Sequence, residues 1–173
     1  MLKVLRSRAE RRNVIDRLCE VVSDRSRATV FFRDFAIADT IDGRFDLQAL
    51  HVWLVLDELQ NRQKTDIGQQ FVDALFIQFD EALRELGAGD VGMSRRMKKM
   101  ASALFGRLEA YRGATDEAAL AEAIARNVYR GEARGVEPAR TLASYCTLAR
   151  AHLAQSRPES GVIDFGPLPT LAG

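Results

Sequence analysis

The most hydrophobic stretch of the chain, Asp39 to Gln60, predicts its central element. After Asp46 the polar positions are few, and the apolar ones are Leu47, Leu50, Val52, Trp53, Leu54, Val55, Leu56 and Leu59. A helix that is apolar on nearly every side is buried rather than laid on a surface. It is too short, and too close to Asp57 and Glu58, to cross a membrane. The pattern therefore predicts a buried helix around which the other elements pack.

The start of this helix carries three local signals. Asp42-Gly43 is typical of a turn, because glycine tolerates positive φ. Asp46 stands where an N-cap residue belongs, with its carboxylate free to accept a backbone N–H. Phe45 and Leu50 have the spacing of a hydrophobic staple. We therefore expect the helix to begin just after Asp46.

Apolar residues that recur at steps of three and four predict further helices. Before the central helix we expect a helix over Glu10–Ser23 and a short helix through Phe31, Phe32 and Phe35, capped by Ser23-Asp24 or Ser26. After it we expect helices over Asp66–Leu86, from Met93 or Ser94 to Gly113, from a cap at Thr115 to Val128, and from Pro138 to Gln155. The loops beside the central helix are expected over Ala36–Arg44 and Asn61–Ile67. The three phenylalanines are interpreted as core residues. No alternating stretch is long enough to predict a strand. The sequence thus predicts an all-α fold, a single compact bundle of six or seven helices around the buried central helix.

Prolines and glycines replace this pattern after Arg157. We expect residues 1–157 to form the helical domain and residues 158–173 to form an extended tail. Ile163 and Phe165 are the side chains expected to dock the tail, with the final residues loose.

Composition limits the kinds of partner. The chain has 173 residues, of which 47% are hydrophobic, which suits one domain with a core. Its formal net charge of +1 argues against wholesale binding to nucleic acid or membrane, so an electrostatic site must be local. Cys19 and Cys146 are interpreted as buried thiols in a reducing compartment. No transmembrane span or cleavable signal is visible, and the basic start, Met1–Arg12, is interpreted as solvated, with membrane-surface contact as the alternative.

Motifs for catalysis are weak. The run Gly87–Gly92 has the spacing of a dinucleotide-binding loop, but that loop follows a β-strand, and here a helix is predicted before it. We interpret the run as a turn between helices. His51 and His152 lie on separate helices, with no metal-ligand or nucleophile motif around them. We expect no enzyme activity, no metal and no cofactor.

Four cations crowd the predicted start of the helix that follows the glycine run: Arg95, Arg96, Lys98 and Lys99. The helix macrodipole is positive at that end and disfavours each cation by about 0.3–1 kcal/mol at low salt, although Asp90 offsets part of this. Two interpretations stay open. The cations form either a solvated face or an anion-binding patch for RNA phosphates, lipid headgroups or an acidic peptide. Likewise, Met93 and Met97 either fill the core or offer a flexible apolar surface to a client protein.

Two segments together resemble the ubiquinol–cytochrome c chaperone family. They are residues 39–51 (DTIDGRFDLQALH) and residues 87–100 (GAGDVGMSRRMKKM), the second followed by Phe105-Gly106-Arg107 and Tyr111. The resemblance extends roughly from the first helix to the last. It implies an α-helical, non-catalytic assembly factor for respiratory complex III that holds newly made cytochrome b. It also implies contact with the ribosome and a small partner protein, as for mitochondrial members.

The resemblance and the patch give one set of candidate partner-binding residues: Arg44, His51, Asp90, Met93, Arg95, Arg96, Met97, Lys98, Lys99, Arg107 and Tyr111. The function we expect is that of an assembly chaperone that binds cytochrome b. The alternative is a small RNA- or ribosome-binding module that uses the basic patch at 95–99. We expect peripheral contact with the membrane surface and no binding to DNA. The expected location is the cytoplasm, including the inner face of the cytoplasmic membrane, rather than the mitochondrial matrix.

Overall fold

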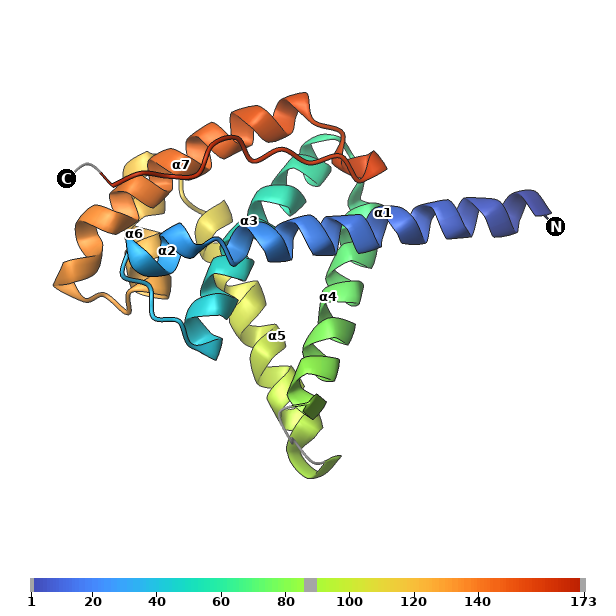
Figure 1. Cartoon of the computed structure of the whole chain (residues 1–173), viewed down its shortest axis with the longest axis horizontal. Helices are drawn as coiled ribbons and strands as arrows, with labels where there is room; N and C mark the ends of the chain where they lie inside the picture. The colour runs from blue at the N-terminus through green and yellow to red at the C-terminus, as the bar shows by residue number, and fades with distance from the viewer. Residues whose placement is uncertain (1, 86–89, 172–173) are drawn as a thin grey trace.

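The computed structural model describes the backbone of residues 2–85 and 90–171 and the side chains of residues 8–85 and 92–171. Within these ranges the chain forms seven α-helices and two short 3-10 helices (Figure 1). They are α1 (Leu2–Ser26), α2 (Thr29–Arg33), α3 (Ile41–Asn61), α4 (Thr65–Glu85), α5 (Asp90–Arg112), α6 (Glu117–Val128), η1 (Ala133–Gly135), α7 (Val136–Gln155) and η2 (Pro158–Ser160). In this part of the chain, β pairing is limited to an isolated bridge between Arg157 and Val162. The predicted all-α fold is confirmed.

Helix α3 is the central element, as the pattern predicts. It contacts α1, α4, α5, α6 and α7, and it passes through the middle of the molecule in Figure 1. Leu50, Trp53 and Leu54 on this helix are almost completely buried. Burial of apolar surface contributes about 25 cal/mol per Å², so α3 supplies a large share of the driving force for folding.

The start of α3 differs from the prediction. The N-cap is Thr40, whose hydroxyl accepts a hydrogen bond from the Gly43 amide at 3.1 Å. The predicted cap at Asp46 was wrong, and the staple that depended on it was wrong too, because Asp46 lies inside the helix and is buried. Gly43 is also helical, and a Cβ there would lie 2.0 Å from the carbonyl oxygen of Ala38. Glycine at this position therefore permits a close approach of backbone rather than a positive φ.

The first two helices also differ from the prediction. Helix α1 begins at Leu2 rather than near Glu10, and it continues to Ser26. The hydroxyl of Ser26 donates to the carbonyl of Val22 within the same helix at 2.7 Å, so it does not cap α2. The N-cap position of α2 is Ala28, which makes no side-chain cap bond. Helix α1 therefore takes up the residues that local signals assigned to the cap of α2.

The predicted starts of α6 and α7 lie within two residues of the observed starts. Helix α6 is capped by Asp116, which accepts from the Ala119 amide at 2.8 Å, and the predicted cap at Thr115 was wrong by one position. Helix α7 begins at Val136 and places Pro138 in its first turn, where proline is tolerated. Both differences are within the usual uncertainty of helix ends.

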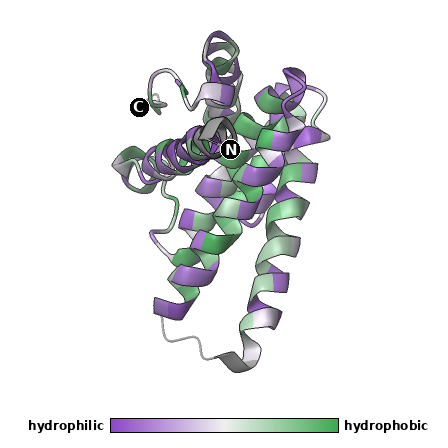
Figure 2. Ribbon diagram, turned by 90° about the vertical axis from the view of Figure 1, so that its right-hand side faces the viewer, coloured by the Kyte–Doolittle hydropathy of each residue, from purple (hydrophilic) through white to green (hydrophobic). Residues whose placement is uncertain are grey.

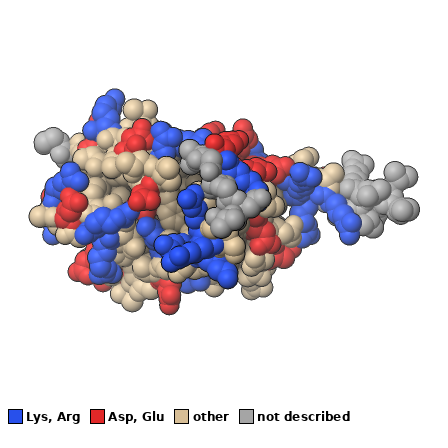
Figure 3. Space-filling view, turned by 90° about the horizontal axis from the view of Figure 1, so that it is seen from below, with Lys and Arg blue, Asp and Glu red and all other residues tan. Residues whose placement is uncertain are grey.

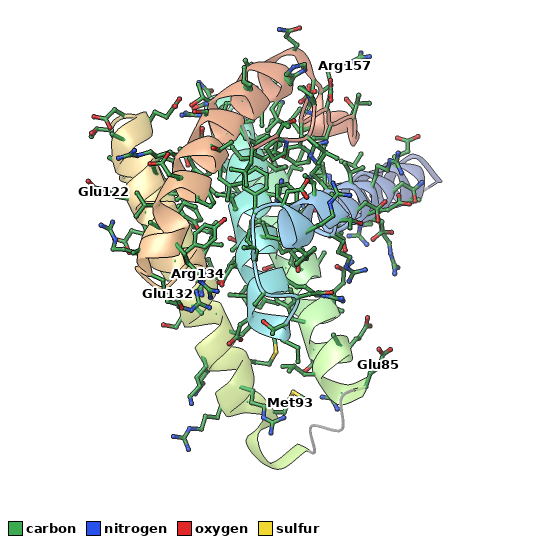
Figure 4. The ribbon with its side chains drawn as sticks, turned by 60° about the vertical axis from the view of Figure 1, so that its left-hand side comes forward. Glu85, Met93, Glu122, Glu132, Arg134 and Arg157 are labelled. Atoms are coloured by element: carbon green, nitrogen blue, oxygen red, sulfur yellow. The ribbon has the colours of Figure 1, made fainter. Side chains whose placement is uncertain are left out.

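Helices α4 and α5 form a hairpin that extends away from the rest of the molecule (Figure 1). Both helices carry hydrophobic and hydrophilic positions along their length (Figure 2). Helix α5 begins already at Asp90, whereas the prediction placed its start at Met93 or Ser94. The side chain of Met93 points from α5 toward α4 (Figure 4). Of the predicted turn Gly87–Gly92, residues 87–89 lie outside the described residues, and residues 90–92 belong to the first turn of α5 rather than to a loop.

The C-terminal tail docks on the bundle and runs alongside α7 (Figure 1). Phe165 is buried and Ile163 packs partly buried against the core, so the two predicted docking residues are confirmed. The guanidinium of Arg25 on α1 donates to the carbonyl oxygens of Gly166 at 2.7 Å and Pro167 at 2.8 Å. The tail is therefore held by apolar packing and by hydrogen bonds to α1.

Cys19 and Cys146 are buried free thiols, as expected. Burial, with a contribution from Asp16, raises the pKa of Cys19 to about 11, and burial also raises the pKa of Cys146. Both thiols are therefore protonated at neutral pH, in which form they are poor nucleophiles.

Candidate partner-binding surface

The four predicted cations lie on the outer side of α5. Arg95, Arg96, Lys98 and Lys99 are all exposed, and none has an ion pair with another described residue. Figure 3 shows Lys and Arg side chains gathered on the face seen from below. Because each residue turns an α-helix by about 100°, Lys98 and Lys99 point to different flanks of α5. The patch is thus a broad cationic side of the helix that carboxylates or phosphates can approach from several directions.

The predicted repulsion between these four cations and the positive end of the α5 macrodipole assumed a helix start that was wrong. Because α5 begins at Asp90, Arg95 and the cations after it lie beyond the first turn. The influence of the macrodipole falls off within that turn. The cations therefore do not oppose the dipole strongly, and their exposure without ion pairs is the remaining observation that favours an anionic partner. The side chain of Asp90 lies outside the described residues.

The methionines beside the patch are packed inward. Met93 is buried, and Met97 and Met100 are partly buried against the hydrophobic core. They fill the space between α5 and its neighbours, as thioether side chains do in irregular cores.

A buried ion cluster joins α5 to α3 and to the end of α6. Arg107 Nε donates to Asp46 Oδ1 at 2.7 Å, and Arg130 Nη2 lies 2.8 Å from Asp46 Oδ2 as an ion pair that is not aligned as a hydrogen bond. The side chain of Asp46 is 1% exposed, against 15% for Arg107 and 48% for Arg130. Burial raises the pKa of Asp46, and the attraction of the two guanidinium groups opposes that rise. The net stability that a buried pair of this kind adds is small, because each charge loses its hydration, but removing one partner leaves the other charge uncompensated.

Arg130 was not among the candidate residues predicted from the sequence. It follows α6 with a φ of 56°, in the left-handed region that non-glycine residues seldom adopt. This conformation brings its guanidinium to Asp46 while another of its nitrogens donates to the carbonyl of Asn127. Its neighbour Gly131, with a φ of 74°, is the one local sequence signal for a turn here.

Helices α3, α5 and α6 border an open cavity of about 410 Å³. Its apolar lining is Ile41, Phe45, Met100 and Ala103, and its polar lining is Asp42, Lys99, Arg107, Arg126, Asn127 and Arg130. Ile41 is 61% exposed, and the guanidinium of Arg107 lies over the ring of Phe45, 5.1 Å from its centroid. The cavity therefore combines an apolar floor with a cationic rim. We name it the α3–α5–α6 cavity.

A second cavity, of about 600 Å³, lies on the other flank of α5, between the end of α3 and the start of α4. Leu56, Val72 and Phe105 supply apolar lining, and Phe105 is 51% exposed. Its ring packs on Phe76 with centroids 6.0 Å apart. An exposed phenylalanine beside a hollow of this size is a feature of surfaces that accept apolar side chains.

Three other candidate residues, His51, Tyr111 and Arg44, make contacts within the protein itself. His51 and Tyr111 are buried in the core, where they cannot contact a partner directly. The ring of Tyr111 packs on Trp53 with centroids 5.6 Å apart. Arg44 is exposed and pairs with Asp39 at 2.6 Å.

The described residues show neither a metal-binding group nor a membrane-spanning helix. In that part of the chain no group of three or more His, Cys, Asp or Glu residues could hold a metal ion. No helix in those ranges is both long enough and apolar enough to cross a membrane.

The sequence profile described as ubiquinol-cytochrome C chaperone matches residues 33–160, so the chain belongs to that family. Among solved structures, the crystal structure of the Cbp3 homolog from Brucella abortus is similar, with a TM-score of 0.80 and 30% sequence identity over 95% of this chain and 97% of that one. Among curated proteins, no sequence matches the chain.

Proposed function

We propose that this chain is a non-enzymatic assembly chaperone for ubiquinol–cytochrome c reductase and that its client is newly made cytochrome b. Membership of the chaperone family, over residues 33–160, is the observation that carries the proposal. The similarity to the Cbp3 homolog over nearly the whole of both chains supports it. We further propose that it acts in the cytoplasm, in peripheral contact with the membrane that receives this client, with the ribosome and a small protein as further partners.

The surface of α5 suits such a client. A newly made membrane protein presents apolar segments together with charged loops, and it needs a holder that contacts both kinds of surface. Helix α5 offers the exposed ring of Phe105 beside a partly apolar cavity and, about two turns away on the same helix, exposed cations such as Lys98. Acidic loops of the client would meet the cations while its apolar side chains meet Phe105.

The test is a deletion strain in which assembled complex III and cytochrome b are measured. We expect both to fall without the protein and to recover with the wild-type gene. The double variant Arg95→Glu/Lys98→Glu should restore them poorly and co-purify less cytochrome b, whereas Arg140→Glu, an exposed charge reversal on α7, should restore them fully. Normal quinol oxidation in the deletion strain would refute the proposal.

The exposed cations of α5 also favour a second candidate, an RNA- or ribosome-binding module. That function predicts affinity for free RNA that falls steeply as salt is raised. The chaperone function requires no tight binding to free RNA. Titration of labelled RNA at two salt concentrations therefore separates the two candidates.

A further inference from the structure

The α3–α5–α6 cavity has an apolar floor that stays partly accessible. Ile41 stands at its edge with 61% of its surface exposed, although it is the first residue of the most buried helix. Phe45 and Met100 form the floor and remain partly accessible. Apolar surface in a concave site is the usual seat for a side chain or ligand from outside.

Two of the four cations at the rim are already partly compensated. Arg107 and Arg130 share the single carboxylate of Asp46, so one negative charge serves two guanidinium groups. Arg130 keeps 48% of its side chain exposed. The buried cluster therefore leaves a net positive charge beside the cavity.

The other two cations of the rim have no close ion pair with a described residue. Lys99 pairs with no described residue, and Arg126 approaches Glu122 only to 3.9 Å, with both side chains well exposed. Asp42 is the one carboxylate in the lining. The rim is thus electrostatically suited to anions, and cations in partly enclosed sites attract carboxylates more strongly than cations on an open surface.

We propose that the α3–α5–α6 cavity binds an acidic segment of another protein, with one apolar side chain in the cavity and flanking carboxylates on Lys99 and Arg126. A volume of about 410 Å³ suits one or two side chains and is too small for the paired acyl chains of a phospholipid. Nucleobases bind by stacking on open aromatic faces, and here the guanidinium of Arg107 covers the ring of Phe45. Guanidinium groups and carboxylates form paired hydrogen bonds of matching geometry. The site is separate from the Phe105 side of α5 and does not depend on the identity of the client.

The test uses a fluorescein-labelled peptide of sequence Glu-Glu-Phe-Glu-Glu and measures its anisotropy with the full chain. We expect saturable binding that weakens about tenfold when Lys99→Glu or Arg126→Glu is introduced. Lys64→Glu is the control, since it makes the same change of charge on an exposed lysine that does not line the cavity; it should change affinity less than about threefold. A peptide with Ser in place of Phe should bind weakly, and so should the wild-type peptide to Ile41→Ser.

Three results would overturn the proposal. The first is no binding of the acidic peptide to the wild-type chain. The second is equal loss of peptide affinity with Lys64→Glu and Lys99→Glu, which would indicate a diffuse electrostatic field rather than a site. The third is binding of anionic vesicles or single-stranded RNA that the Lys99→Glu and Arg126→Glu variants abolish while the peptide does not bind. Because the readout is peptide binding in solution, failure here leaves the assembly assay of the proposed function unaffected, and failure there leaves this result standing.

Discussion

The hydroxyl of Tyr145 donates a hydrogen bond to Nε2 of His51 at 2.9 Å, although 94 positions separate the two residues in sequence. The direction follows from the other side of the ring, where Nδ1 lies 2.8 Å from the carbonyl oxygen of Leu47 and must be the donor. The tyrosine oxygen in turn accepts from Arg25 Nε at 2.9 Å. This chain of hydrogen bonds ties α3 to α7 and α1 in the middle of the core, and it requires a neutral imidazole.

Acid should destabilise the protein through His51. Burial lowers its pKa from 6.5 to about 4. The unfolded chain then binds a proton that the folded chain does not, so this contribution to stability is complete above pH 6.5 and is lost as the pH falls toward 4. We expect the free energy of unfolding to fall by about 2 kcal/mol between pH 7.5 and pH 5 from this residue alone. Urea denaturation at both pH values measures the loss.

His51→Gln is the control for that measurement. Glutamine does not titrate, so the variant should be less stable at pH 7.5 but should lose less stability than the wild type on acidification. The other histidine, His152, lies near Asp164 and is present in both proteins. The same slope with pH in both proteins would contradict the assignment.

Removing the charge of Asp46 should be costly. Asp46→Asn leaves Arg107, which is 15% exposed, without its anionic partner. Breaking one side of a buried ion pair destabilises proteins by about 3–5 kcal/mol, and the partial exposure of Arg130 favours the lower end of that range. Asp39→Asn removes the partner of Arg44 in an exposed pair and should leave the midpoint of thermal unfolding unchanged. Equal midpoints for both variants would show that the Asp46 cluster does not fix α3 against α5.

The ion cluster of Asp46, Arg107 and Arg130 could not be predicted from the sequence. The buried residues of α3 and of the other helices could be predicted, because the spacing of apolar residues along the sequence indicates which side of a helix faces the core. Asp46 was read as an N-cap because an aspartate after Phe45 and before an apolar run is the usual local signal for one. Its partners, Arg107 and Arg130, lie far along the chain, and no local pattern indicates which arginines converge on one carboxylate.

Only the part of the candidate surface that lies on one stretch of sequence could be predicted. The exposed cations of α5 are visible as a charge run, and the family resemblance follows from two motifs. The α3–α5–α6 cavity was not foreseen, because it exists only where the ends of α3 and α6 meet the middle of α5. Arg126 and Ile41 look like ordinary surface residues until those elements are assembled.

Two helical glycines should respond in opposite ways to alanine. Gly43→Ala places a Cβ 2.0 Å from the Ala38 carbonyl oxygen, and since both groups are backbone the start of α3 must shift. We expect a loss of at least about 2 kcal/mol, by analogy with overpacked cores. A Cβ on Gly106 in α5 meets nothing within 4 Å, so Gly106→Ala should stabilise the protein by about 0.5–1 kcal/mol through helix propensity. Chemical denaturation of the two variants checks both signs.

Arg25 should control how tightly the tail is held. Its guanidinium donates to the Gly166 and Pro167 carbonyls and to the Tyr145 hydroxyl, so Arg25→Met removes bonds to the tail and to the core together. Each such bond contributes about 1 kcal/mol, enough for local opening of the tail to rise about tenfold or more. We expect faster amide hydrogen exchange and faster proteolysis after Arg157, with the helices α3 and α7 less affected.

A second variant separates the tail from the core network. Gly166 has a φ of 70°, and a Cβ there would lie 2.4 Å from the ring of His152, so Gly166→Ala should release the tail while Arg25 and Tyr145 stay paired. Arg12→Met, which removes an exposed ion pair with Asp16 on the same helix as Arg25, should leave exchange in the tail unchanged. If Arg25→Met and Arg12→Met gave equal exchange rates, the tail would be held by the packing of Phe165 alone. Release by Gly166→Ala without loss of global stability would show instead that the tail opens independently of the bundle.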